Sequence, residues 1–265
     1  KKLRSIAVRA AQKVYPRLGL RDSDIILASF PKSGNTWMRF IWANMVSLME
    51  LEGREIDFHT INGELDAEYD SYSYGSIEYR SLPRLVKTHK RYDNRFDKNK
   101  SIYLYRHPGD VMLSFYDYKR GQKNNEFQNV ALSKFMRDPQ NGIPAWCRHV
   151  KSWIPETDIL ITYEGMKQKA SQVVHRILEC FSLSEISEQV VRNAVHRSSF
   201  QNMRKVEEKK GRPSLREGRF DENYRFTRKA RFGEWKDRLS KGDIAYIIDE
   251  VDKFGLSSIV DFEVQ

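Results

Sequence analysis

The chain has 265 residues, of which 40% are hydrophobic and 31% charged, enough for one sizeable core. No apolar run approaches the ~20 residues that span a bilayer, the first residues do not form a signal peptide, and two cysteines exclude a disulfide framework. A formal charge of +10 favours an anionic partner without choosing which one. We therefore expect a cytoplasmic protein without a membrane span.

The first part of the chain predicts a basic helix and then a strand, a loop and a longer helix. Residues 5–15 form the helical pattern, within a peripheral N-terminal segment, 1–20. An apolar strand over 25–30 ends at Pro31, and a polar loop, 32–36, follows. The next apolar residues recur at helical spacing, at Trp37, Phe40, Ile41, Met45 and Leu48.

Strands and helices alternate along the rest of the chain. Apolar runs predict strands over 84–90, 101–106 and 158–164, whereas 66–80 has neither period. Helical patterns follow Pro108 and the strand at 158–164, and cover 144–154, 184–198 and 242–254. Such alternation implies βαβ units, so we predict one α/β domain over 1–265, with a central parallel sheet flanked by helices.

Polar residues follow the predicted strands at their carboxyl ends. The loop 32–36 follows the first strand, Lys87 and His89 end the second, and Arg106 and Tyr163 end the other two. Ligands of parallel α/β sheets bind beyond these ends, so the four sets are expected to meet in one site.

The loop 31–37 has the composition of an anion site. Backbone N–H groups at a helix N-terminus favour an anion, Gly34 permits close approach, and Lys32 adds a positive charge. Ser33 and Thr36 supply hydroxyl groups. The alternative is a simple helix cap beside a solvated lysine. The apolar strand before the loop and the adjacent Lys32 favour the anion site.

Arg106 and Ser114 form a second candidate for binding phosphate. The guanidinium fork at a strand end suits phosphate geometry, and Ser114 lies two helical turns further along. The competing interpretation pairs Arg106 with Asp110 as a local cap, and the residues alone leave both open.

Lys87 and His89 alternate on one strand, so their side chains face the same side. Histidine suits proton abstraction from an alcohol near neutral pH, and a lysine stabilises charge that develops on a transferred group. A lone strand histidine is more often structural, but the lysine two residues earlier favours a catalytic pair.

Basic residues also gather late in the chain. Arg228 and Lys229, flanked by aromatic residues, suit an exposed basic loop. The charged, Gly- and Pro-containing stretch 204–226 suggests a lid that orders over a ligand. The histidines and cysteines lack metal-ligand spacing, so no metal is expected.

Six motifs together resemble the sulfotransferases that use 3′-phosphoadenosine 5′-phosphosulfate (PAPS). "FPKSGNTW" (30–37) resembles their 5′-phosphosulfate loop, and "YRHPGDVMLS" (105–114) their 3′-phosphate motif. The other matches are "VKTH" (86–89), "TYEGMK" (162–167), "SSFQNMR" (198–204) and "RKARFGEWK" (228–236). The motifs occur in family order over most of the chain. The resemblance implies a P-loop-kinase-like fold and transfer of the sulfuryl group of PAPS to a hydroxyl group or an amine of an acceptor, with 3′-phosphoadenosine 5′-phosphate (PAP) as product.

The resemblance also implies roles for individual residues. The implied catalytic residues are Lys32, Lys87, His89 and Ser114. The implied donor-binding residues are Lys32, Ser33, Gly34, Asn35, Thr36, Trp37, Arg106, Ser114, Tyr163, Ser198, Phe200, Arg228, Lys229 and Ala230. Trp37 and Phe200 would sandwich the adenine, near Tyr163 and Ser198. His89 would be the general base of an in-line transfer that needs no metal.

Three positions depart from the family pattern. Asn35 replaces the first threonine of a Thr-Thr pair, so one hydroxyl contact to the 5′-phosphate would become an amide contact. Ala230 replaces a glycine, and Ser198 replaces a threonine. None of these changes removes a charge.

The acceptor is expected to be a small molecule, a glycan or a lipid that carries a hydroxyl group. The segments expected to line its pocket, 57–82, 116–145 and 204–226, contribute many aromatic residues. They include Tyr69, Tyr72, Tyr74, Tyr79, Phe115, Tyr116, Tyr118 and Phe127. Two other functions stay open at this point, a P-loop-type kinase and a nucleic-acid-binding protein. The oligomeric state is not readable.

Overall fold

The computed structural model describes residues 20–65, 67–69, 77, 79–211, 218–220, 224–225, 227, 231–260 and 262. Its strands are β1 Ile25–Ala28, β2 Ala67–Glu68, β3 Leu85–Thr88, β4 Lys100–Tyr105 and β5 Ile159–Thr162. Its α-helices are α2 Asn35–Glu50, α3 Pro108–Arg120, α4 Leu132–Met136, α5 Ile143–Trp153, α6 Tyr163–Cys180, α7 Glu188–Arg197, α8 Phe200–Lys210, α10 Trp235–Arg238 and α11 Lys241–Lys253. A π-helix covers Thr60–Glu64 and a 3₁₀-helix Asn94–Phe96. The predicted N-terminal helix lies outside the described residues.

The five strands form one parallel sheet in the order β2-β3-β1-β4-β5. β1 lies at its centre, between β3 and β4, so the loops that follow these three strands emerge side by side. This arrangement confirms the predicted α/β class with a central parallel sheet.

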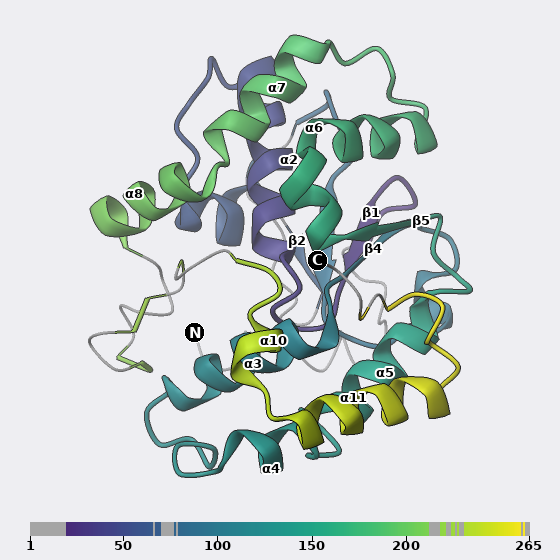
Figure 1. Cartoon of the computed structure of the whole chain (residues 1–265). Coiled ribbons are helices and arrows are strands. Elements are labelled where there is room, and N and C mark those ends of the chain that lie inside the picture. Colours follow the sequence, from purple (N-terminus) through teal and green to yellow (C-terminus); the bar gives the residue numbers. More distant parts are fainter. Residues whose placement is uncertain are drawn as a thin grey trace, which may run out of the picture.

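Helices cover both faces of the sheet (Figure 1). α2, α6 and α7 lie on one face, and α3, α5 and α11 lie on the other. Alternation along β1 explains the two layers: Ile25 and Leu27 join the first core, and Ile26 and Ala28 join the second. Because the central strand β1 buries both of its faces, it is an apolar run without polar alternation.

The structure corrects the prediction in the segment without a clear period. Residues 60–64 form a π-helix and residues 67–68 form the edge strand β2, which pairs with β3. The short helices α4 and α10, and helix α8, were not predicted either. The stretch 204–226 begins inside α8, and residues 212–217, 221–223 and 226 lie outside the described part of the chain.

Helix α8 is fastened at its C-terminal end to two distant segments. Lys210 Nζ lies 2.7 Å from Glu55 Oε2 and 3.2 Å from Asp57 Oδ2. The buried Glu207 carboxylate accepts hydrogen bonds from the Thr227 backbone N–H and hydroxyl. These bonds join the helix that begins at Phe200 to the chain just before Arg228.

Candidate active site

A cleft of about 1010 Å³ opens where β1, β3, β4 and β5 end. The predicted site residues that line it are Lys32, Gly34, Asn35, Thr36, Trp37, Lys87, His89, Arg106, Ser114, Tyr163 and Phe200. Residues far apart in sequence therefore meet in one cavity, as the strand-end argument required. Arg228, Lys229 and Ala230 lie outside the described residues.

The loop after β1 turns tightly into helix α2. Lys32 and Gly34 both have left-handed backbones, with φ of 71° and 105°. Gly34 is the N-cap of α2, and the first turn of this helix contains no acidic residue. The first backbone N–H groups of a helix lack intrahelical acceptors, so they and the helix dipole offer a site for an anion.

Two residues predicted near the donor do not line the cleft. Ser33 is fully buried in the loop. Ser198 is fully buried too, and its hydroxyl accepts a 3.0 Å hydrogen bond from Asn44 Nδ2 on α2. Ser198 therefore packs between α2 and α7, and its predicted place near the adenine stays a prediction.

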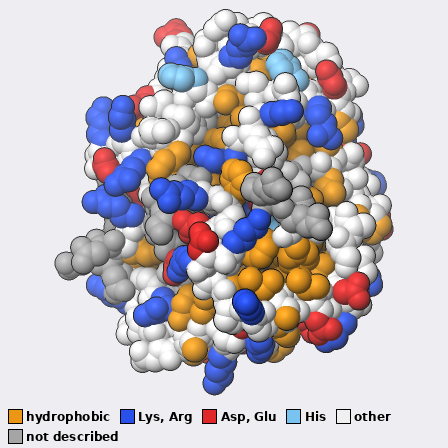
Figure 2. Space-filling view, in the orientation of Figure 1, with side chains coloured by type: hydrophobic (Ala, Val, Ile, Leu, Met, Phe, Trp, Pro, Cys, Tyr) orange, Lys and Arg blue, Asp and Glu red, His pale blue; other side chains and the backbone are white. Residues whose placement is uncertain are grey.

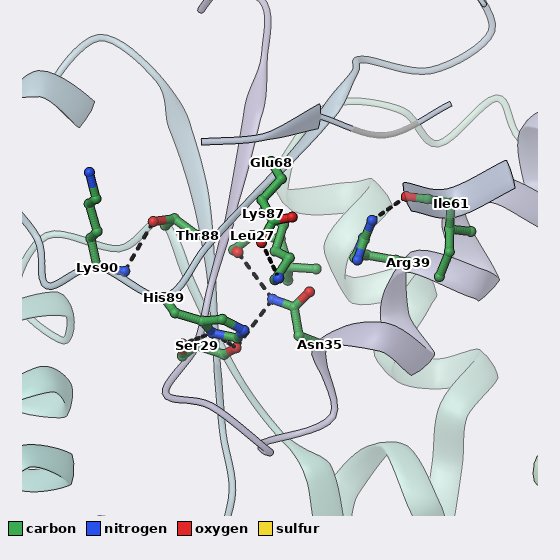
Figure 3. A network of polar contacts seen from close by, with 10 residues as sticks. All are labelled: Leu27, Ser29, Asn35, Arg39, Ile61, Glu68, Lys87, Thr88, His89 and Lys90. Atoms are coloured by element: carbon green, nitrogen blue, oxygen red, sulfur yellow. Dashed lines mark hydrogen bonds and ion pairs between the residues drawn. The ribbon is translucent and has the colours of Figure 1, made fainter. Parts of the chain in front are cut away.

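The Asn35 side chain bonds to the end of β1 and the residue after it. Its Nδ2 donates to Leu27 O at 3.3 Å and to Ser29 Oγ at 3.2 Å, and Figure 3 shows the amide directed at the end of β1. This donor group ties the start of α2 to the end of β1, and the expected amide contact with a 5′-phosphate stays a prediction.

The position of Arg106 is compatible with both interpretations that the sequence left open, a local pairing with Asp110 and a phosphate-binding role. Its Nη2 lies 3.7 Å from Asp110 Oδ2 and donates to Arg231 O at 2.8 Å, while the guanidinium carbon lies 4.4 Å from the Tyr163 ring centroid. Its Nε is buried and has no hydrogen-bond partner within the described part of the chain. A buried unmatched donor costs about 1–3 kcal/mol, which an anionic ligand would relieve.

Asp110 anchors the segment that follows residues 228–230, which lie outside the described part of the chain. Its carboxylate accepts hydrogen bonds from the backbone N–H groups of Gly233 and Trp235, at 2.6 and 3.1 Å. Burial raises the pKa of this carboxyl group. Asp110 therefore brings Arg231, which lines the cleft, close to Arg106.

Lys87 and His89 lie at the β3 end of the cleft (Figure 3). His89 Nδ1 donates to Ser29 O at 2.7 Å, which leaves the lone pair of the neutral imidazole on Nε2. Lys87 Nζ forms a 2.5 Å ion pair with Glu68 Oε1 of β2. The side chains therefore stand where a proton acceptor and a stabilising cation are needed.

The backbone that carries His89 is fixed from helix α5. Tyr103 OH donates to His149 Nδ1 at 2.8 Å, and His149 Nε2 donates to His89 O at 3.1 Å. Trp153 Nε1 donates to Lys90 O at 2.9 Å. Burial lowers the pKa of His149 to about 4, so this histidine is a neutral structural link.

Burial and the positive charge of Lys87 hold the pKa of His89 well below 6.5. Both effects disfavour the imidazolium, so His89 is a neutral base at pH 7 and loses this form only as pH falls through its lowered pKa. We expect the acid limb of kcat/KM for the donor to lie below pH 6.5. Lys87→Met should move this limb to higher pH, whatever its effect on the maximum. An unmoved limb would show that another group titrates.

Several cleft residues were given no role in the sequence analysis. Lys167 Nζ lies 5.8 Å from the Trp37 ring centroid, and Arg39, Arg219 and Arg231 also line the cleft. Lys167 is the last residue of "TYEGMK", one helical turn after Tyr163, so helical spacing would have found it.

The described residues contain no cluster of three or more His, Cys, Asp or Glu side chains that could bind a metal ion. Among the described helices, none combines the length and apolar character needed to cross a membrane.

The fold and the cleft define a class of enzyme. The N-terminus of α2, Arg106, Lys87 and a neutral His89 all border the cleft, and Asn35 at the start of α2 and His89 both contact Ser29. Such a site transfers a group from an anionic donor to an acceptor that loses a proton.

Comparisons with known proteins identify the family. The sulfotransferase domain model matches residues 22–253. Amine sulfotransferase of Oryctolagus cuniculus is 28% identical, over 83% of this chain and 77% of its own, and sulfotransferase 1B1 of Canis lupus familiaris is 30% identical, over 69% and 67%. The chain belongs to the sulfotransferase family, which confirms the resemblance and favours sulfuryl transfer over the kinase alternative.

A solved structure shares the fold. Retinol dehydratase in complex with androsterone and the inactive cofactor PAP superposes with a TM-score of 0.68, at 17% identity, over 92% of this chain and 83% of its own.

Proposed function

We propose that the enzyme transfers the sulfuryl group of PAPS to a hydroxyl group of a small acceptor. The observation that carries this proposal is the meeting of the β1 loop, Arg106 and His89 in one cleft. PAP bound to retinol dehydratase, which shares the fold, supports the choice of donor. A hydroxyl acceptor would give its proton to His89. The relatives also include a protein named amine sulfotransferase.

The donor would lie along the ends of β1, β4 and β5. Lys32 and the backbone N–H groups at the start of α2 would bind the 5′-phosphosulfate. Arg106 and Ser114 would bind the 3′-phosphate, with Arg228 and Lys229 beside them. Trp37 of α2 and Phe200 of α8 would hold the adenine. Tyr163 would hold Arg106 in place, because its ring packs against the guanidinium.

The reaction would be an in-line displacement at sulfur. The acceptor oxygen attacks sulfur, the bond between sulfur and the bridging oxygen breaks, and its electron pair leaves on PAP. His89 Nε2 takes the acceptor's proton, while Lys32 and Lys87 stabilise the negative charge around the transferred group. The ion pair with the Glu68 carboxylate, which fixes the Lys87 side chain, supports this role.

Calorimetric titration with PAP, and with ATP in the presence and absence of Mg²⁺, tests the donor site. We expect PAP to bind at least ~100-fold more tightly than ATP, a difference of about 2.8 kcal/mol, because the loop and Arg106 suit a 5′- and a 3′-anion. Transfer of labelled sulfuryl from PAPS would then be measured. Mg²⁺-dependent ATP binding without a response to PAP would contradict the proposal.

A further inference from the structure

The sheet order divides the cleft into two ends. If the donor occupies the ends of β1, β4 and β5, as proposed above, the acceptor must approach His89 from the side of β3 and β2. We call this side the acceptor end. We assign to it the lining residues of that side, Asn62, Glu68, Lys87 and His89, together with those from the C-terminal part of α3 and beyond, Phe115, Tyr118, Lys119, Gln122 and Arg219.

The described lining of the acceptor end is mainly polar. Phe115 and Tyr118 are its aromatic members. Two aromatic residues predicted to line it are elsewhere: Tyr69 is fully buried against Phe96, with ring centroids 5.0 Å apart, and Phe127 is buried against Phe135, at 5.1 Å. The described side chains of the acceptor end therefore do not form an apolar pocket of the kind that binds a flat hydrocarbon.

Lys119 is the cation of the acceptor end whose charge is least compensated. Its Nζ lies over the rings of Phe115 and Phe127, 5.3 and 5.5 Å from their centroids. Among the described residues the Lys119 ammonium makes no hydrogen bond and no ion pair. By contrast, Lys87 is paired with Glu68, and Asp117 Oδ2 lies 3.5 Å from Arg238.

Two carboxylates, Glu126 and Asp138, influence Lys119 but form no ion pair with it. Glu126 and Asp138 favour its charged form from beyond ion-pair distance, and Asp138 Oδ1 already accepts hydrogen bonds from the Gln140 and Asn141 backbone. Burial outweighs them and lowers the pKa of Lys119. A partly buried ammonium that faces a cleft without a full counter-charge gains from an incoming anion. Arg219 adds a second positive charge to this end.

We propose that the acceptor carries an anionic group, such as a carboxylate, in addition to the hydroxyl that receives the sulfuryl group, and that Lys119 binds this anion. The hydroxyl would lie at His89 and the anion further along α3, where Phe115, Tyr118 and Lys119 share one end of the helix. The aromatic rings would contact the body of the acceptor.

The test compares acceptors that differ only in charge, with PAPS saturating. The pairs are 4-hydroxyphenylacetate with its amide, and methyl β-glucuronoside with methyl β-glucoside. We expect kcat/KM to favour the acid of at least one pair by about 10-fold or more, as a charge-assisted contact allows. Lys119→Met should reduce this ratio to near one, and Lys119→Glu should reduce it below one, in favour of the neutral acceptor.

Lys151→Met is the matched control, because Lys151 is an exposed lysine of α5 that does not line the cleft. It should keep the wild-type ratio. PAP titration of every variant shows whether the donor site is intact. Normal PAP binding with neutral acceptors used at least as well as the acids, or with no acid used at all, would overturn the inference alone. Failure of the wild-type enzyme to bind PAP would overturn the proposed donor and this inference with it.

Discussion

His89→Ala is expected to lower kcat about 10²- to 10⁴-fold, the usual contribution of a general base, while the Kd for PAP stays within about twofold. The reason is geometric. His89 lines the β3 end of the cleft, its Nδ1 is committed to Ser29 O, and its pKa is held below 6.5 by burial and Lys87. The imidazole thus presents a neutral nitrogen to the acceptor and contributes nothing to the proposed donor contacts. Single-turnover rates and PAP calorimetry would measure the two quantities.

His89→Asn separates the base from the structural bond. An asparagine amide can still donate to Ser29 O but cannot accept a proton at neutral pH. The His89→Asn variant should therefore have a kcat as low as that of His89→Ala. His196→Ala is the control, because His196 is exposed on α7 and does not line the cleft. Turnover of His89→Asn within about tenfold of the wild type would place the base elsewhere, since a base contributes at least ~10²-fold.

The parts of the site that follow from local signals were predictable from the sequence. An apolar strand, a Pro-ended loop and a helical repeat fix the turn around Lys32 and Gly34, because each signal acts over a few residues. The parallel sheet then brings the residues after β1, β3 and β4 together. For this reason Lys32, His89 and Arg106 all line the observed cleft.

The side-chain partners that the sequence did not predict are those set by tertiary contacts. Ser198 fits its motif, but packing between α2 and α7 buries it against Asn44. Asn35 was expected at a phosphate, yet the nearest acceptors of its amide belong to the end of β1. Tyr69 follows a two-residue strand with no pattern of its own, so its burial depends on the pairing of β2 with β3. Composition alone cannot reveal these partners.

The charge of the chain also needs the structure to be interpreted. A formal charge of +10 suits nucleic acid, anionic lipid and small anions alike. Lys and Arg side chains are spread over the face shown in Figure 2. What distinguishes the cleft is that Lys32, Arg106 and Lys119 face one cavity from different elements. A folded cavity of this kind selects a small, multiply charged molecule over an extended polymer.

Gly34→Ala is expected to weaken PAP binding by about 100-fold or more, a loss of about 2.8 kcal/mol or more. A Cβ on Gly34 would lie 2.6 Å from Tyr163 Cδ2, and the backbone there has φ of 105°. Tyr163 or the loop must therefore shift. Tyr163 packs against Trp37, with ring centroids 6.0 Å apart, and against the Arg106 guanidinium, so either shift disturbs the proposed adenine and 3′-phosphate contacts together. PAP calorimetry and thermal unfolding would follow the two effects.

Gly255→Ala provides the matched control for backbone strain. Gly255 also has a left-handed backbone, with φ of 70°, but a Cβ there meets nothing within 4 Å. It should therefore cost only the left-handed penalty, about 1–2 kcal/mol of stability, and leave PAP affinity unchanged. If Gly34→Ala lost stability like Gly255→Ala and still bound PAP normally, the contact between the loop and Tyr163 would be irrelevant to the donor. Loss of PAP binding in Gly34→Ala alone would assign the effect to the loop at Gly34, where the crowding of Tyr163 and the strain at φ of 105° act together.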